Sequence, residues 1–269
     1  MRAHSLIGMS FALKASAVCD RAFLEKTAAG YIQAQASGKL DSLPLAANVS
    51  YQENDVPLPL SQAVLSNPMT IDFNRTIYDT TECALFTELT AATNPHPYVI
   101  STRMLFTNDQ RISTIQSVVA DTGDWLFNAT SYLHWTQQET WDPIPPGRRD
   151  TRSVLRAAGD AYLDSWTNAT VQVPYGTPCA RLEGGIYTGQ RNASANSCTM
   201  PLFPEPFTIS NRRYVVDEVL GAVGIFNDFP FIEKTRPEGT PSTNLFRVEG
   251  GRIRYIHEVT VCATRNCGR

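Results

Sequence analysis

The chain has 269 residues, of which 42% are hydrophobic and 18% are charged, and its formal net charge is −3 at pH 7. This composition excludes a disordered chain and a coiled coil, and the length is sufficient to bury a substantial core. The charge shows none of the basic excess that is typical of nucleic-acid-binding proteins. With only 4 histidines, a histidine-rich metal site is not expected. We therefore expect a soluble globular protein that needs neither a metal nor a cofactor.

Residues 1–17 have the pattern of a signal peptide. Arg2 supplies positive charge, residues 6–13 are mostly apolar, and Ala15-Ser16-Ala17 has the small residues that precede a cleavage site. Because Lys14 interrupts the apolar stretch, an ordinary buried N-terminal segment stays open as the alternative. No later window approaches the ~20 apolar residues that cross a bilayer, so we expect no membrane span and an extracellular protein.

The cysteines and the glycosylation sequons support the same compartment. The 6 cysteines are even in number, and none has the tandem C-x-x-C spacing of a zinc site. We predict two local disulfides and a third from the remaining pair, with free buried thiols as the alternative. The predicted pairs are Cys19–Cys83, Cys179–Cys198 and Cys262–Cys267. Asn-x-Ser/Thr sequons that we expect to carry glycans occur at Asn48, Asn74, Asn128, Asn168 and Asn192.

A proline-rich segment divides the chain into two similar halves. Residues 141–150 contain prolines and a glycine that suit neither a helix nor a central strand, so we read this segment as a linker. The same order of signals follows on both sides. We therefore predict a first domain over residues 18–140 and a second over residues 151–269, related by an internal repeat.

Each half opens with an amphipathic helix. Asp20 is suited to cap the first helix, and Asp150 or Thr151 the second. Tyr31 and Tyr162 stand at equivalent positions of these two helices. The repeat therefore begins with the same kind of element in both halves.

A short extended segment and a hairpin follow each helix. The extended segments end in Glu53 and Glu183, and the hairpins turn at residues 107–109 and 249–251. One face of such a small sheet must be covered, and the helix can cover it. We predict an α+β fold of two tandem cones, each a helix packed on a curved antiparallel sheet of three or four strands, arranged as an internal pseudo-dimer.

The second hairpin resembles the closing hairpin of the nuclear transport factor 2-like superfamily. That hairpin has the form F-x-x-x-x-G-x-I-x-x-I, which Phe246, Gly251, Ile253 and Ile256 match, whereas the first hairpin lacks the glycine. The resemblance implies a cone with a pocket at its open end. It also implies a function class that ranges from ketosteroid isomerases, scytalone dehydratases and polyketide cyclases to non-catalytic binding modules.

The whole chain also resembles a group of secreted fungal proteins of unknown function. The similarity rests on segments 95–100, 123–130, 176–185 and 211–218. This second resemblance covers nearly the full length, but it implies no particular activity.

The site hypothesis rests on the alternation of side chains along the strands of the second half. Along 254–259, strict alternation places His257 with Tyr255 and Val259, and the hypothesis takes that face as the concave one. We predict that His257 and Asp217 converge in the second pocket with Tyr187, where the histidine moves a proton. The predicted substrate-binding residues are Arg181, Arg213, Tyr214 and Tyr255.

Less specific interpretations stay open beside this site. His257 can instead be a hydrogen-bonded core histidine, and Arg213 and Asp217 can be exposed strand charges. The first half offers Tyr78, Asp79, Glu82, Arg103 and His96. If Cys19 and Cys83 are bridged, we expect the first half to be mainly structural and the second half to hold the ligand.

The expected function is that of a secreted protein that holds a small, largely apolar molecule in a cone-shaped pocket. Cofactor-free isomerase, dehydratase or cyclase chemistry is a possible extension. The alternative is a non-catalytic secreted binding or interaction protein. The chain contains neither a G-x-S-x-G motif nor a phosphate-binding loop, so neither a serine hydrolase nor a nucleotide-binding protein is expected.

Overall fold

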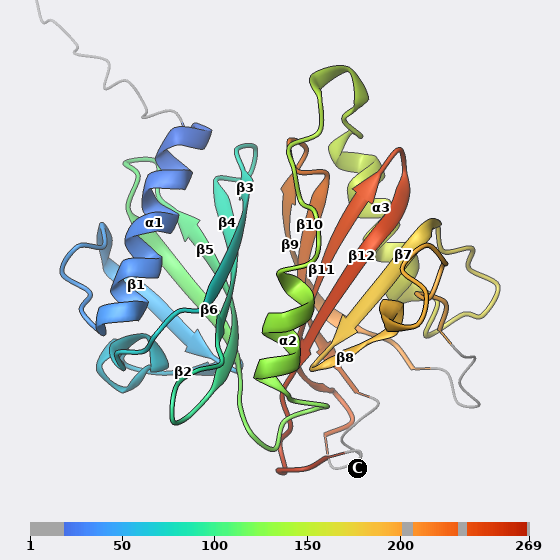
Figure 1. Ribbon diagram of the computed structural model, residues 1–269. Coiled ribbons are helices and arrows are strands. Elements are labelled where there is room, and N and C mark those ends of the chain that lie inside the picture. The colour runs from blue at the N-terminus through green and yellow to red at the C-terminus, as the bar shows by residue number, and fades with distance from the viewer. Residues whose placement is uncertain (1–18, 201–206, 231–235, 268–269) are drawn as a thin grey trace, which may run out of the picture.

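The computed structural model describes residues 19–200, 207–230 and 236–267, so the predicted leader at 1–17 lies outside the described residues. The fold is α+β, with two six-stranded sheets that face each other (Figure 1). Helix α1 covers the outer side of one sheet, α3 covers the outer side of the other, and α2 lies between the sheets.

The two halves contain the same order of elements. The first half consists of α1 (Arg21–Ser37), β1 (Leu45–Glu53), β2 (Val56–Pro57), β3 (Phe73–Asp79), β4 (Ala84–Ala91), β5 (Tyr98–Phe106) and β6 (Ile112–Ala120). After α2 (Ala129–Thr136), the second half consists of α3 (Arg152–Asp164), β7 (Tyr175–Glu183), β8 (Ile186–Tyr187), β9 (Ser210–Asp217), β10 (Ala222–Phe229), β11 (Thr240–Glu249) and β12 (Arg252–Thr260). Short 3-10 helices are formed by Leu60–Gln62, Val64–Ser66, Pro146–Arg148 and Thr188–Gln190.

The strand order is also the same in both sheets. It runs β2-β1-β6-β5-β4-β3 in the first and β8-β7-β12-β11-β10-β9 in the second. The prediction of a purely antiparallel sheet of three or four strands was wrong. The strand that follows each helix joins the sheet beside the last strand and runs parallel to it, as β1 does with β6 and β7 with β12. Turn signals reveal hairpins but not this pairing between distant segments.

The helices begin where polar side chains or turns allow it. Asp20 caps α1 as predicted, because its Oδ1 accepts from the Phe23 amide at 2.8 Å, and α1 ends before Gly38 at a left-handed φ of 67°. Thr151 is the N-cap residue of α3, but its side chain makes no capping hydrogen bond. Asp150 instead accepts from the amide of Gly251 at 2.9 Å and ties the helix start to the last hairpin.

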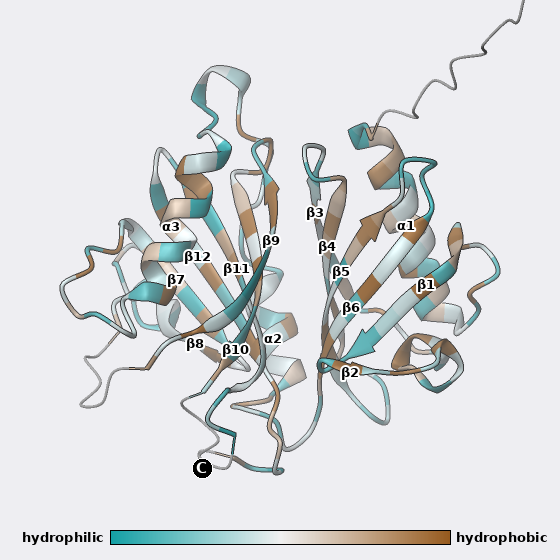
Figure 2. Cartoon of the chain, turned by 180° about the vertical axis from the view of Figure 1, so that it is seen from behind, coloured by the Kyte–Doolittle hydropathy of each residue, from teal (hydrophilic) through white to brown (hydrophobic). Residues whose placement is uncertain are grey.

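Each sheet has apolar side chains on both faces, and Figure 2 shows hydrophobic residues along the strands of both halves. One face packs on the helix of its own half. The other face packs on the second sheet, and we call this contact the seam. Ile77, Phe86, Val215, Phe226 and Leu245 are buried there. Phe86 and Phe226 meet edge to face with ring centroids 5.6 Å apart.

Three disulfides fasten the fold, and they are the three predicted pairs, Cys19–Cys83, Cys179–Cys198 and Cys262–Cys267. The first joins the start of α1 to the turn before β4. The second closes the loop after β7, and the third closes the C-terminal tail. No helix among the described residues is both long and apolar enough to cross a membrane.

Candidate functional site

The structure does not bring the three predicted catalytic residues together. His257 lies on β12 and Asp217 on β9, and β10 and β11 separate these two strands. Tyr187 lies on β8, at the opposite edge of the same sheet, where its ring stacks on Trp135 at 4.5 Å. The predicted convergence of His257 and Asp217 in one pocket was therefore wrong.

His257 points into the seam. Its Nδ1 lies 3.0 and 3.1 Å from the two carboxylate oxygens of Glu88, and its Nε2 lies 2.7 Å from Glu139 Oε2. Tyr132 donates to Glu88 at 2.5 Å. His257 is 1% exposed. The alternative interpretation of His257 as a hydrogen-bonded core histidine is confirmed.

Asp217 serves a different contact. Its carboxylate accepts from Arg21 Nη1 at 3.0 Å and from the amides of Tyr78 and Val219 at 3.0 and 2.9 Å. Although it lines a surface pocket of about 350 Å³, its side chain is 1% exposed. Asp217 is thus neither an exposed strand charge nor a partner of His257, and it ties α1 and β3 to β9.

Three of the four predicted substrate-binding residues are engaged in other contacts. Arg213 pairs with Asp55 at 2.9 Å, and the Tyr214 hydroxyl donates to Asp160 at 2.6 Å. Tyr255 stacks on the ring of Trp141 at 6.0 Å. Only Arg181 lies among the buried polar groups on the helix-facing side of the second sheet.

Those buried polar groups come from neighbouring strands and from α3. Glu258 on β12 is paired in register with Asn244 on β11 and with Glu183 on β7. Asn244 Nδ2 donates to Glu258 Oε2 at 3.4 Å. Arg181 donates to the Tyr162 hydroxyl at 3.4 Å, and its Nη2 lies 3.4 Å from Glu183 Oε2. We call these five residues the interior polar group.

Burial changes the protonation of this group. Burial and the neighbouring charge of Glu183 raise the pKa of Glu258 to about 8. At neutral pH Glu258 is therefore mostly a neutral carboxyl that can donate a hydrogen bond. Burial lowers the pKa of Arg181, but its interactions with the Tyr162 hydroxyl and the Glu183 carboxylate raise it more, so Arg181 stays a cation. Burial also raises the pKa of Tyr162 well above its ordinary value, which keeps that hydroxyl protonated.

Two atoms of the interior polar group and one of its neighbour have no hydrogen-bond partner within the described part of the chain. They are Arg181 Nε, Glu258 Oε1 and, on β10, Asn227 Oδ1. Asn227 belongs to the same chain of contacts, because its amide donates to Asn244 Oδ1 at 2.9 Å. Leaving a buried polar atom without a partner costs about 1–3 kcal/mol. Such atoms in a native protein call for an explanation, and a bound polar molecule is one.

The first half places a closed network at the equivalent positions. Glu53 pairs with Ser117 as Glu183 pairs with Glu258, so Ser117 corresponds to Glu258 and Thr102 to Asn244. Tyr31 meets Thr102 at 2.7 Å, and Thr102 meets Ser117 at 2.8 Å. Glu53 accepts from Tyr51 at 2.6 Å and from the Val64 amide at 2.8 Å. The first half therefore satisfies the positions that the second half leaves incomplete.

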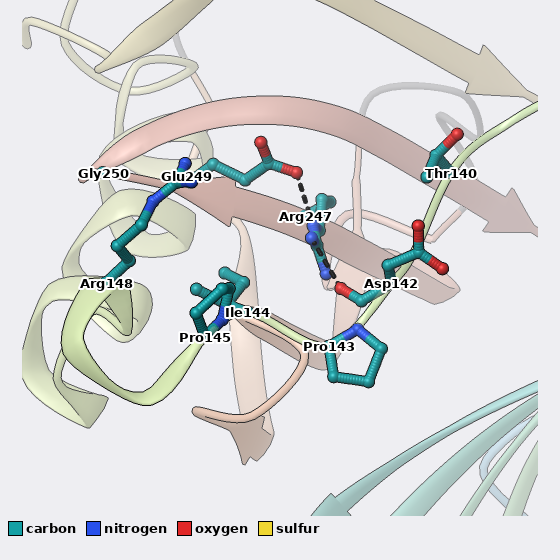
Figure 3. A pocket seen from close by; sticks show the side chains of 9 residues that line it. All are labelled: Thr140, Asp142, Pro143, Ile144, Pro145, Arg148, Arg247, Glu249 and Gly250. Atoms are coloured by element: carbon teal, nitrogen blue, oxygen red, sulfur yellow. Dashed lines mark hydrogen bonds and ion pairs between the residues drawn. The ribbon is translucent and has the colours of Figure 1, made fainter.

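Two surface pockets bear on where a molecule can approach. One of about 660 Å³ lies between the last hairpin and residues 137–151, the segment between α2 and α3 that we call the connector (Figure 3). There Arg247 already donates to Glu249 at 2.8 Å and to the Asp142 carbonyl at 2.9 Å. A smaller pocket of about 260 Å³ beside the C-terminal end of α3 is lined in part by Tyr175. No residue of the interior polar group lines this pocket, but the ring of Tyr175 lies 6.5 Å from that of Tyr162.

Sequence reasoning missed four of the five residues of the interior polar group. It named Arg181 but gave no role in the site to Glu258, Asn244, Tyr162 or Glu183. Among the described residues, no cluster of three or more His, Cys, Asp or Glu side chains could hold a metal.

A family model described as "Domain of unknown function (DUF8021)" matches residues 148–260 of the chain. The matched segment runs from the connector to the end of β12 and includes the whole interior polar group. A comparison with curated proteins found no match.

Proposed function

We propose that the chain is a secreted protein whose second half binds a small molecule through the interior polar group. The observation that carries this proposal is the contrast between the halves. Equivalent positions form a closed hydroxyl network in the first half, whereas Arg181 Nε, Glu258 Oε1 and Asn227 Oδ1 are left without partners in the second. A ligand that completes these hydrogen bonds recovers the cost of burying them.

The hydrogen-bonding pattern favours a neutral ligand with an oxygen at its polar end. Arg181 Nε and the neutral carboxyl of Glu258 can both donate to one acceptor oxygen, and Asn227 Oδ1 needs a donor. Around them stand the rings of Tyr162, Tyr175 and Phe246, which suit an apolar or aromatic body. We therefore expect a carbonyl or hydroxyl compound with an apolar frame.

The same arrangement suits cofactor-free isomerase, dehydratase or cyclase chemistry. A guanidinium and a neutral carboxyl that donate to a carbonyl oxygen stabilise the negative charge that develops when a proton leaves the adjacent carbon. A nuclear transport factor 2-like fold for each half agrees with this proposal, since each half has a helix on one face of a sheet. A non-catalytic binding protein is the second candidate, favoured by the position of His257 in the seam rather than beside this group.

Secretion is supported by the disulfides and by the sequons. All five sequon asparagines, Asn48, Asn74, Asn128, Asn168 and Asn192, are exposed. Expression through a secretory pathway should therefore yield a glycosylated protein whose mass falls on treatment with an N-glycosidase. Protein that is retained in the cell, or whose mass does not change, would contradict this part of the proposal.

Ligand binding is tested with a panel of neutral aromatic ketones and phenols, measured by thermal shift and calorimetry. Arg181→Lys keeps the charge beside Glu183 but removes the Nε–H, so it should weaken binding of any ligand found by about tenfold or more, the loss expected for one hydrogen bond to a charged group. Arg213→Lys is the matched control, because Arg213 pairs with Asp55 away from the interior polar group. Equal binding by both variants would overturn the assignment. Conversion of a panel member by the wild type, reduced in Arg181→Lys, would identify an enzyme.

A further inference from the structure

The seam holds His257 with a carboxylate at each ring nitrogen. Nδ1 faces Glu88 at 3.0 Å, and Nε2 faces Glu139 at 2.7 Å. A neutral imidazole has one N–H and one lone pair, so in that form the lone pair would face a carboxylate. Only the doubly protonated ring can donate on both sides. The short contacts with a carboxylate at each ring nitrogen therefore favour a charged His257 over a neutral one.

The groups around His257 form a balanced set of charges. His257, Glu88 and Glu139 have side chains that are each 1% exposed. Arg75 Nη1 lies 3.2 Å from Glu88 Oε2 and 3.4 Å from His257 Nδ1. Tyr132 donates to Glu88, and Trp141 Nε1 donates to Glu139 at 2.9 Å. Two cations thus face two carboxylates, and removal of one proton would leave an uncompensated negative charge that is shielded from water.

These residues come from segments that only the seam brings together. Glu88 lies on β4 of the first half, His257 lies on β12 of the second, and Glu139 lies on the connector after α2. A single protonated ring thus joins both sheets and the connector. It is independent of the interior polar group, which lies on the opposite face of the second sheet.

We propose that the seam is a pH-dependent latch, which is closed while His257 carries both protons and is loosened when an alkaline medium removes one.

The electrostatics of the cluster agree with this geometry. Burial lowers the pKa of His257, but Glu139 and Glu88 raise it more, from 6.5 to about 9. Between these two values the folded chain holds a proton that the unfolded chain has released. The contribution of His257 is therefore complete below pH 6.5 and is lost as the pH rises through 9. Over this interval the folding equilibrium constant should fall by about tenfold per pH unit on account of His257.

Two measurements on the full chain test the latch. Nitrogen-15 NMR of the His257 ring should show both nitrogens protonated at pH 7, and the wild type should lose stability steeply between pH 7 and 9. His257→Gln removes the titrating group, so the difference between the two pH profiles isolates its contribution. If that variant does not fold, Glu139→Gln keeps the side-chain shape but removes one carboxylate, and it should shift the decline to lower pH.

The control is His96→Gln, because the His96 side chain is 58% exposed and contacts a single carboxylate, Asp121, on one side of its ring within the described residues. This variant should have the wild-type pH profile. Above pH 9, hydrogen exchange at α2 and at the connector should accelerate in the wild type by more than base catalysis of exchange accounts for, and by more than it does in α1, if the seam is what loosens. A neutral His257 ring at pH 7, or a decline that is identical in wild type and His257→Gln, would overturn the latch.

Discussion

Ser117 and Glu258 occupy the same place in the two halves, each paired across a parallel ladder with the glutamate that ends the neighbouring strand. Ser117 completes a hydrogen-bonded network with Thr102, whereas Glu258 retains an unpartnered oxygen. The repeat thus preserves the framework while the chemistry of one buried position changes. Under the proposed function, the first half is the structural copy and the second half is the binding copy.

Glu258→Met should stabilise the ligand-free protein. The substitution replaces a buried carboxyl that has one unpartnered oxygen with an apolar side chain of similar length. Because the bond that is lost from Asn244 is long, at 3.4 Å, we expect a net gain of about 1 kcal/mol at pH 7. Urea denaturation measures this change in the free energy of unfolding. Ser117→Ala is the contrasting variant in the first half, because it breaks the bond to Thr102 and should cost about 1 kcal/mol. A clear loss of stability in Glu258→Met would contradict the account.

Glu258 should also make stability depend on pH. Its pKa is about 8 in the folded chain and 4.5 ordinarily, so the folded state holds a proton that the unfolded state releases. The resulting stabilisation is complete below pH 4.5 and is lost as the pH rises through 8. Thermal unfolding between pH 4.5 and 8 should show this decline, and Glu258→Met should flatten it. An equal slope in both proteins would show that Glu258 is ionised throughout.

Glu88 should determine the pH at which the protein loses stability in acid. Burial raises its pKa, but His257 and Arg75 lower it more, from 4.5 to about 2. The stabilisation due to Glu88 is therefore present above pH 4.5 and is lost as the pH falls through 2. Glu88→Gln should remove this acid transition in thermal unfolding between pH 5 and 2. A transition of unchanged size in the variant would assign it to other carboxylates.

Gly224→Ala should weaken the seam. An added Cβ at Gly224 would lie 2.7 Å from Cδ2 of the Phe86 ring, and Phe86 also packs against Phe226. We expect a loss of about 1–3 kcal/mol by chemical denaturation. Gly147→Ala is the control, since nothing lies within 4 Å of a Cβ at Gly147, and it should be nearly neutral. Similar effects at both positions would contradict tight packing of the two sheets.

The helices, the repeat and two of the disulfides could be predicted from the sequence because their signals are local, and the third disulfide, Cys19–Cys83, followed as the remaining pair. Asp20 before an apolar stripe marks a helix start, and Cys179 and Cys198 are close in the chain. The parallel pairing of β1 with β6 could not be predicted, because it joins segments that are more than 60 residues apart. The partners of His257 could not be predicted for the same reason, since Glu88 and Glu139 lie far from it in the sequence.

The prediction that His257 lies on the ligand-facing side of the second sheet was wrong for a specific structural reason. Strict alternation along β12 puts Ile253 on the face of His257, but the register shifts between Ile253 and Tyr255. Ile253 and Ile256 therefore both pack under α3, and Glu258 follows them inward while His257 turns to the seam. The I-x-x-I spacing was the signal, because two residues three positions apart on one strand can pack on the same face only across a bulge.

The most direct test of the account is an amide NMR titration of the full chain with the best binder from the ketone and phenol panel. The account predicts shifts centred on Arg181, Asn227 and Glu258, with little change at Tyr51, Thr102 and Ser117 in the first half. Shifts that are confined to residues 140–148 beside the larger surface pocket, or that are equal in the two halves, would contradict it.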